Sequence, residues 1–90
     1  MAVEVRIPTI LRTYTGGQKT VTSSGATLAE LVDQLDASYP GIREKLIEDG
    51  DLRRFVNVFL ADEDIRFLQG IDTPVTEGQV VSIVPAVAGG

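Results

Sequence analysis

The last two residues of the chain, Gly89 and Gly90, combine residue type and position in a way that could serve chemistry. Because glycine makes up about 7% of an average protein, two glycines end a chain by chance in about 0.5% of cases. Neither residue has a side chain, so an extended backbone ending here could enter a narrow channel and deliver only its carboxylate. That carboxylate is ionised at neutral pH and is a poor electrophile, so another molecule must activate it.

The rest of the sequence contains few residues that could catalyse a reaction. It has no histidine and no cysteine, which excludes Ser–His and Cys–His nucleophiles, disulfides and thiolate metal sites. The acidic segments 49–51 and 62–64 lack the ligand spacing of a calcium-binding loop, so we interpret them as solvated turns. Gly16 and Gly17 lack the lysine and hydroxyl of a phosphate-binding loop. We therefore predict no catalytic residue, no metal site and no cofactor bound by this chain.

Length and charge narrow the class of protein further. Ninety residues correspond to one domain, and 13 acidic against 8 basic residues give a net charge of −5. A nucleic-acid-binding protein usually shows a basic footprint, which this composition lacks. The N-terminus does not have the basic and apolar regions of a signal peptide, and no apolar run approaches the roughly 18 residues that span a bilayer. We expect a cytoplasmic protein with no nucleic-acid and no membrane partner.

Hydrophobic periodicity in the first half predicts a hairpin followed by a helix. Residues 3–7 alternate between apolar and polar, which indicates a half-buried strand, and turn residues 14–17 precede a second, antiparallel strand over 18–23. Thr27 and Glu30 have the spacing of a capping box at the start of a helix. An apolar stripe at helical spacing then follows, formed by Leu28, Leu31, Val32, Leu35 and Tyr39.

The second half predicts a short helix and further strands. Pro40 and Gly41 end the first helix, and residues 42–48 form a second one. Residues 55–61 and 79–84 are rich in β-branched and aromatic side chains, which indicates strands, and 65–67 forms a short pairing strand. The inward side chains of the second helix are expected to be Ile42, Leu46 and Ile47.

This order of elements predicts an α+β fold, in which a sheet is covered on one face by the main helix. The folded domain is expected to span residues 1–84. Residues 85–90 carry no charge and are expected to form a flexible C-terminal tail that reaches roughly 15–20 Å when extended.

One face of the predicted sheet has no element of its own to cover it. If positions 56, 58 and 60 face the helix, the side chains of Phe55, Asn57 and Phe59 point to the other face. Exposed apolar patches tend to mark binding sites for partners, so we predict a partner surface there. A one-residue error in register reverses every side chain, and in that alternative these three residues belong to the core.

Five segments of the sequence carry a resemblance to known proteins. They are I-P-T-I-L-R at 7–12, T-G-G-Q-K at 15–19, R-F-V-N-V-F at 54–59, D-E-D-I-R-F at 62–67 and I-V-P-A-V-A-G-G at 83–90. Together they resemble the ubiquitin-like sulfur carriers of thiamin and molybdopterin biosynthesis, the ThiS/MoaD-like family. The resemblance covers essentially the whole chain, and it is closest to the branch that serves an alternative route of cysteine biosynthesis in actinobacteria. It implies a β-grasp fold, with a mixed four- to five-stranded sheet packed on one main helix plus a short second helix.

The family resemblance also implies a function for the tail. An E1-like adenylating and sulfurtransferase enzyme uses ATP to adenylate the carboxyl of Gly90, and sulfur then replaces AMP to give a thiocarboxylate. Gly89, Ala88 and Val87 present this covalent site, and the sheet face around Phe59 is similar to the surface that family members show to the activating enzyme.

Two further partners are implied by the cysteine-biosynthesis branch. A pyridoxal-phosphate-dependent cysteine synthase supplies the aminoacrylate, formed from O-phosphoserine, that the thiocarboxylate sulfur attacks. A zinc-dependent peptidase then releases the cysteinyl adduct from Gly90. ATP, pyridoxal phosphate and zinc therefore belong to the partners, and this chain is a co-substrate and not an enzyme.

Three alternatives stay open at the level of sequence. The carrier could serve molybdopterin, thiamin or another sulfur-containing product. The same tail also suits a ubiquitin-like protein modifier, whose activated Gly90 forms isopeptide bonds with lysines of target proteins. A plain interaction domain with a frayed end is the third alternative, because chain termini are commonly frayed.

Overall fold

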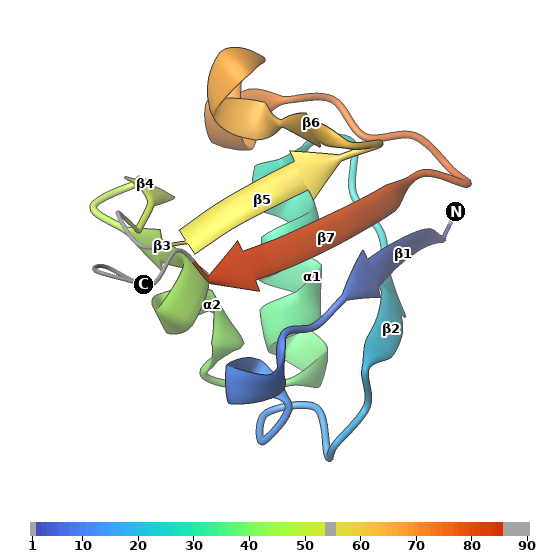
Figure 1. Cartoon of the computed structure of the whole chain (residues 1–90), viewed down its shortest axis with the longest axis vertical. Coiled ribbons are helices and arrows are strands. Elements are labelled where there is room, and N and C mark those ends of the chain that lie inside the picture. The colour runs from blue at the N-terminus through green and yellow to red at the C-terminus, as the bar shows by residue number, and fades with distance from the viewer. Residues whose placement is uncertain (1, 54–55, 86–90) are drawn as a thin grey trace.

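The computed structural model describes residues 2–53 and 56–85, and it arranges them as a sheet with helices against one face (Figure 1). Short 3-10 helices connect several of the elements. The strands are β1 (Val3–Arg6), β2 (Thr20–Ser23), β3 (Ile47–Glu48), β4 (Asp51–Leu52), β5 (Val56–Leu60), β6 (Glu63–Asp64) and β7 (Val80–Pro85); the helices are α1 (Leu28–Ser38) and α2 (Ile42–Leu46); the 3-10 helices are η1 (Thr9–Leu11), η2 (Ile65–Phe67) and η3 (Gly70–Asp72).

The main sheet has five strands in the order β2-β1-β7-β5-β6. β1 runs parallel to β7 and antiparallel to β2, and β5 runs antiparallel to both β7 and β6. The last strand of the chain therefore lies in the middle of the sheet, with α1 crossing behind it (Figure 1). This mixed sheet on one main helix, with a short second helix, is the β-grasp arrangement, and the expected fold class is confirmed.

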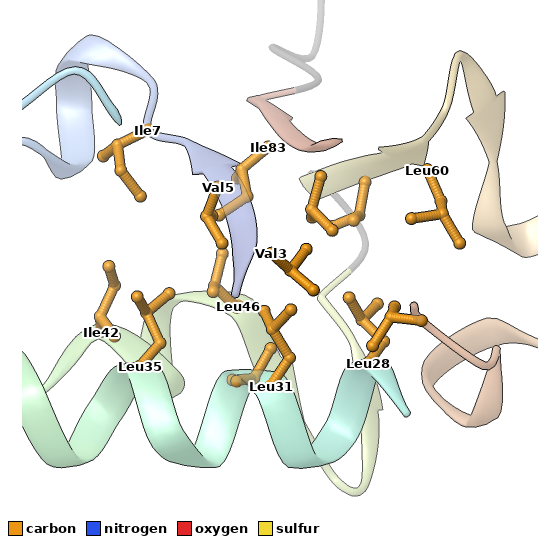
Figure 2. Packing of buried hydrophobic residues seen from close by; sticks show 14 of the residues in the cluster. Val3, Val5, Ile7, Leu28, Leu31, Leu35, Ile42, Leu46, Leu60 and Ile83 are labelled. Atoms are coloured by element: carbon orange, nitrogen blue, oxygen red, sulfur yellow. The ribbon is translucent and has the colours of Figure 1, made fainter. Parts of the chain in front are cut away.

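The hydrophobic core lies between the sheet and α1 (Figure 2). Val3 and Val5 on β1 are at most 2% exposed, and Leu28, Leu31 and Leu35 on α1 are each 1% exposed. Burying an aliphatic side chain of this size contributes roughly 1.5–3 kcal/mol, so these alternating and helical stripes hold the two layers together. Ile42, Leu46 and Ile47 are also buried, as the sequence predicts.

The start of α1 is fixed by side-chain hydrogen bonds. The backbone N–H of Glu30 donates to the hydroxyl oxygen of Thr27 at 3.4 Å, so Thr27 is the N-cap. The Glu30 carboxylate in turn accepts from the backbone N–H of Ala26 at 3.2 Å. In a standard capping box this second donor is the N-cap residue itself, so the predicted box forms with its return bond shifted by one residue.

The prediction of a second helix over 42–48 is wrong for its last two residues. α2 ends at Leu46, and Ile47–Glu48 forms β3, which pairs with β4 as a small hairpin. Asp49 and Gly50 connect the two strands with φ of 54° and 80°. An Asp-Gly pair favours a two-residue turn in which both central residues have positive φ, and this turn directs the preceding residues into a strand.

The prediction of a pairing strand over 65–67 is also wrong. β6 is formed by Glu63–Asp64, and Ile65–Phe67 is the 3-10 helix η2. Ala61 and Asp62 have positive φ, so the chain reverses within two residues and pairing begins earlier than expected. The Asp64 carboxylate then accepts the backbone N–H of Arg66 at 2.9 Å, which caps η2 and ends the strand.

We expect Thr27→Ala to lower the free energy of unfolding by about 1 kcal/mol, because the N-cap loses its acceptor. For a domain of this size the melting temperature should fall by roughly 4–8 °C. Thr27→Ser keeps an acceptor oxygen and is the matched control. Thermal unfolding followed by circular dichroism measures both variants, and equal melting temperatures for Thr27→Ala and the original chain would contradict the capping role.

Candidate functional site

The tail that the sequence singles out follows the central strand of the sheet. β7 runs through Pro85, one residue into the range 85–90 assigned to the tail. The roles proposed for the tail remain predictions, since Val87, Ala88, Gly89 and Gly90 lie outside the residues that the structure describes. The described part nevertheless gives the position from which the tail starts (Figure 1).

The end of β7 is paired differently from its beginning. Val81 and Ser82 have register partners on both sides, in parallel with β1 and in antiparallel with β5. The register with β1 ends at Arg6↔Ser82, whereas the register with β5 continues to Val56↔Pro85. The final residues of β7 thus take their position from β5.

The sheet face opposite α1 carries the residues proposed for partner binding. The side chains of Val58 and Leu60 are buried in the core, with solvent-exposed fractions of 2% and 6%. Strand alternation therefore places Asn57 and Phe59, both half-buried, on the outer face. Phe55 lies outside the described residues. The alternative register, which would put Asn57 and Phe59 in the core, is excluded, while the binding role of this face stays a prediction.

The neighbours of Phe59 are polar on both sides. Phe59 pairs with Ser82 on β7 and with Asp64 on β6. One row further along, Asn57 pairs with Val84, which is 41% exposed. The outer face near the tail is therefore a partly apolar strip with polar edges, rather than a wide hydrophobic patch.

A shallow hollow of about 470 Å³ adjoins this strip, between the 61–62 turn and the turn before β7. The guanidinium of Arg6 in this hollow forms an ion pair with Glu4 at 3.3 Å. Because both side chains are well exposed, the pair contributes little to stability. The lining residues are Arg6, Ala61, Asp62, Gly78, Gln79, Val80 and Ser82.

Among the residues that the structure describes, the most exposed large apolar side chain was missed by the sequence reasoning. Phe67 is 87% exposed and the adjacent Leu68 is 41% exposed, both at the end of η2. The sequence placed residues 65–67 in a strand, where Ile65 and Phe67 share a face. In the 3-10 helix Ile65 is instead fully buried and Phe67 points to solvent.

The acidic segments 49–51 and 62–64 lie in tight turns and in the short strands next to them. Asp49 and Asp51 belong to the β3–β4 hairpin, and Asp62 lies in the turn before β6. Within residues 2–53 and 56–85, no group of three or more acidic, histidine or cysteine side chains could hold a metal ion.

In the same part of the chain, no helix has both the length and the apolar character needed to cross a membrane.

Comparison with known proteins connects this geometry to a family. The model of the ThiS family matches residues 5–90, which include the central strand and the whole tail. The chain belongs to the ThiS family. Its membership is consistent with the sheet topology, in which the terminal strand occupies the middle of the sheet.

Individual relatives share both sequence and fold with this chain. It is 52% identical to the sulfur carrier protein CysO of Mycobacterium tuberculosis, over an alignment covering all of both chains. A chain in the crystal structure of the Amycolatopsis orientalis BexX/CysO complex superposes with a TM-score of 0.95 and 48% identity, covering 99% of this chain and 100% of that one. These similarities support the role of a sulfur carrier.

A relative with a different name is also similar along its whole length. The small archaeal modifier protein 3 of Haloferax volcanii is 34% identical, and the alignment covers all of both chains. Carriers and modifiers therefore both occur among the relatives of this ThiS family member.

Proposed function

We propose that this chain carries sulfur on the carboxyl of Gly90. In the first step the carboxylate attacks the α-phosphate of ATP on an E1-like enzyme, which forms the acyl adenylate and releases pyrophosphate. In the second step a sulfide-level sulfur nucleophile attacks the acyl carbon. A C–S bond forms, the C–O bond to AMP breaks, and the product is a thiocarboxylate.

The terminal Gly89-Gly90 pair of a ThiS family member is the observation that carries this proposal. The chain contains no cysteine, so it has no thiol on which to hold sulfur, and no histidine with which to activate its own carboxyl. Sulfur that it carries covalently is therefore assigned to the terminal carboxyl, and activation is assigned to a partner. On this reading the chain is a co-substrate of other enzymes.

The proposed sulfur acceptor is the three-carbon unit of O-phosphoserine. The 52% identity to a protein named CysO supports this choice over molybdopterin or thiamin. A pyridoxal-phosphate-dependent cysteine synthase is proposed to present the acceptor, and a zinc-dependent peptidase to release cysteine and return the Gly90 carboxylate. Holding sulfur on a tethered carboxyl gives a high effective concentration at the acceptor and avoids release of free sulfide.

A protein modifier is the second candidate function, favoured by the full-length relative named a small archaeal modifier protein. The same adenylate of Gly90 would then be attacked by a lysine amine of a target protein. The product would be an isopeptide bond, with AMP released. Both functions use the same acyl adenylate of Gly90, so they differ only in the nucleophile that attacks its acyl carbon.

The proposal is tested by intact mass after a complete reaction. We expect the carrier, incubated with its activating enzyme, ATP, sulfide, O-phosphoserine and a cysteine synthase, to gain about 103 Da as one cysteine residue on Gly90. A variant lacking Gly90 is the control and should gain nothing. If lysine-linked conjugates form while the cysteinyl adduct is absent, the chain is a modifier. If only the thiocarboxylate forms, with a gain of about 16 Da, the chain carries sulfur but O-phosphoserine is not its acceptor. If neither a thiocarboxylate nor a conjugate forms, both functions are excluded.

The outer sheet face is proposed to contact the activating enzyme through Phe59 and Asn57, and Phe55, which lies outside the described residues, is proposed for the same contact. Its support is the place of Asn57 and Phe59 on the outer face of β5, the strand that pairs with the end of β7. Phe67, exposed on η2, is available to extend the same contact.

We expect Phe59→Ser to raise the KM of the activating enzyme for the carrier by about tenfold, because aromatic residues at the centre of an interface carry much of its energy. Ala37→Ser, on the exposed side of α1, is the control and should leave KM unchanged. Circular dichroism at the assay temperature verifies that both variants are folded. An unchanged KM for folded Phe59→Ser would remove this face from the docking model.

A further inference from the structure

The side chain of Arg66 reaches from η2 to the start of β5. Its guanidinium donates to the side-chain oxygen of Asn57 at 2.6 Å, to the carbonyl of Arg53 at 2.8 Å and to the carbonyl of Val56 at 2.7 Å. The three acceptors are 9, 13 and 10 residues away along the chain. One side chain therefore joins η2, the start of the β4–β5 connection and the first residues of β5.

These hydrogen bonds occupy an edge that no strand covers within the described residues. β6 pairs only with Phe59 and Leu60, so the first part of β5 has no neighbour on that side. The backbone N–H of Val56 turns back to the Arg53 carbonyl at 3.1 Å, and Arg66 donates to that carbonyl and to the carbonyl of Val56. The guanidinium thus takes the place of a missing strand where β5 begins.

The backbone of Arg66 is itself held in place. Its N–H donates to the Asp64 carboxylate at 2.9 Å, and the preceding Ile65 is fully buried in the core. A fixed backbone and three fixed acceptors leave the guanidinium little freedom. The planar fork of arginine suits such a site, because it offers several donors in one rigid arrangement, whereas lysine offers a single point of charge.

The clamped residues lie directly beside the end of the last strand. Val56 and Asn57 pair with Pro85 and Val84, beyond the point where the register with β1 stops. The position of the end of β7 depends on β5, and the start of β5 is held by Arg66. We propose that Arg66 is a positioning residue that sets where the tail leaves the sheet and thereby aligns Gly90 for activation.

This inference rests on the proposed function, and kinetics can separate it from a docking role. A misplacement of about 1 Å at a reacting group can lower a rate by up to 10²-fold. We expect Arg66→Gln to lower kcat for thiocarboxylate formation by about tenfold, with KM within a factor of two. Arg66→Lys keeps the charge but cannot hold three acceptors, so it should restore less than half of kcat. Arg43→Gln is the matched control, because Arg43 also donates to a side chain, Asp33 at 2.9 Å, but between the two helices.

Hydrogen exchange of the free carrier gives a second readout that needs no enzyme. In Arg66→Gln the amides of Asn57 and Val84 should exchange about tenfold faster, while that of Val81, paired on both sides, stays unchanged. If Arg66→Gln does not fold, Arg66→Lys is measured in the same way.

Unchanged exchange at Asn57 and Val84, or equal kcat for Arg66→Gln and Arg43→Gln, would overturn the positioning role. A change in KM alone, restored by lysine, would overturn it as well, because Arg66 would then act as a charge toward the partner. Failure of the unmodified carrier to form any thiocarboxylate would refute the proposed function instead, and the exchange data would still decide whether Arg66 holds the end of β7.

Discussion

The antiparallel pairing of β5 with β7 is the interaction on which the rest of this structure depends. Its register runs from Val56↔Pro85 to Leu60↔Val81. This register sends Val58 and Ile83 into the core, and it leaves Asn57 and Phe59 on the outer face. A slip of one residue would exchange the two faces and would also move the point where the tail begins.

The same pairing bears on the proposed chemistry of a chain that has no histidine and no cysteine. The core and the five-stranded sheet hold the last strand in the middle of the fold, and the tail begins at its end. Recognition and reactivity are then divided between two parts of the chain. The outer face and η2 form the proposed contact with a partner, while the proposed covalent chemistry takes place at Gly90.

Much of this arrangement could be predicted from the sequence because the long elements follow simple periodicities. The alternation in residues 3–7 and the stripe from Leu28 to Leu35 each correspond to a buried face. The two-residue strands were not found, since their pairing is set by turns. Asp49-Gly50 was a readable hairpin signal, whereas Ala61 with positive φ was not, because alanine seldom adopts that conformation. The contacts of Arg66 were beyond sequence reasoning altogether, as its acceptors lie 9 to 13 residues away.

The central claim is that the carboxyl of Gly90 is the one position at which this chain holds sulfur. Fragment-ion mass spectrometry of the carrier, after incubation with the activating enzyme, ATP and sulfide, tests it most directly. The account predicts a gain of about 16 Da, from replacement of oxygen by sulfur, confined to fragments that contain Gly90. Sulfur on any other residue, or no gain when the enzyme has consumed ATP in the presence of the carrier, would contradict it.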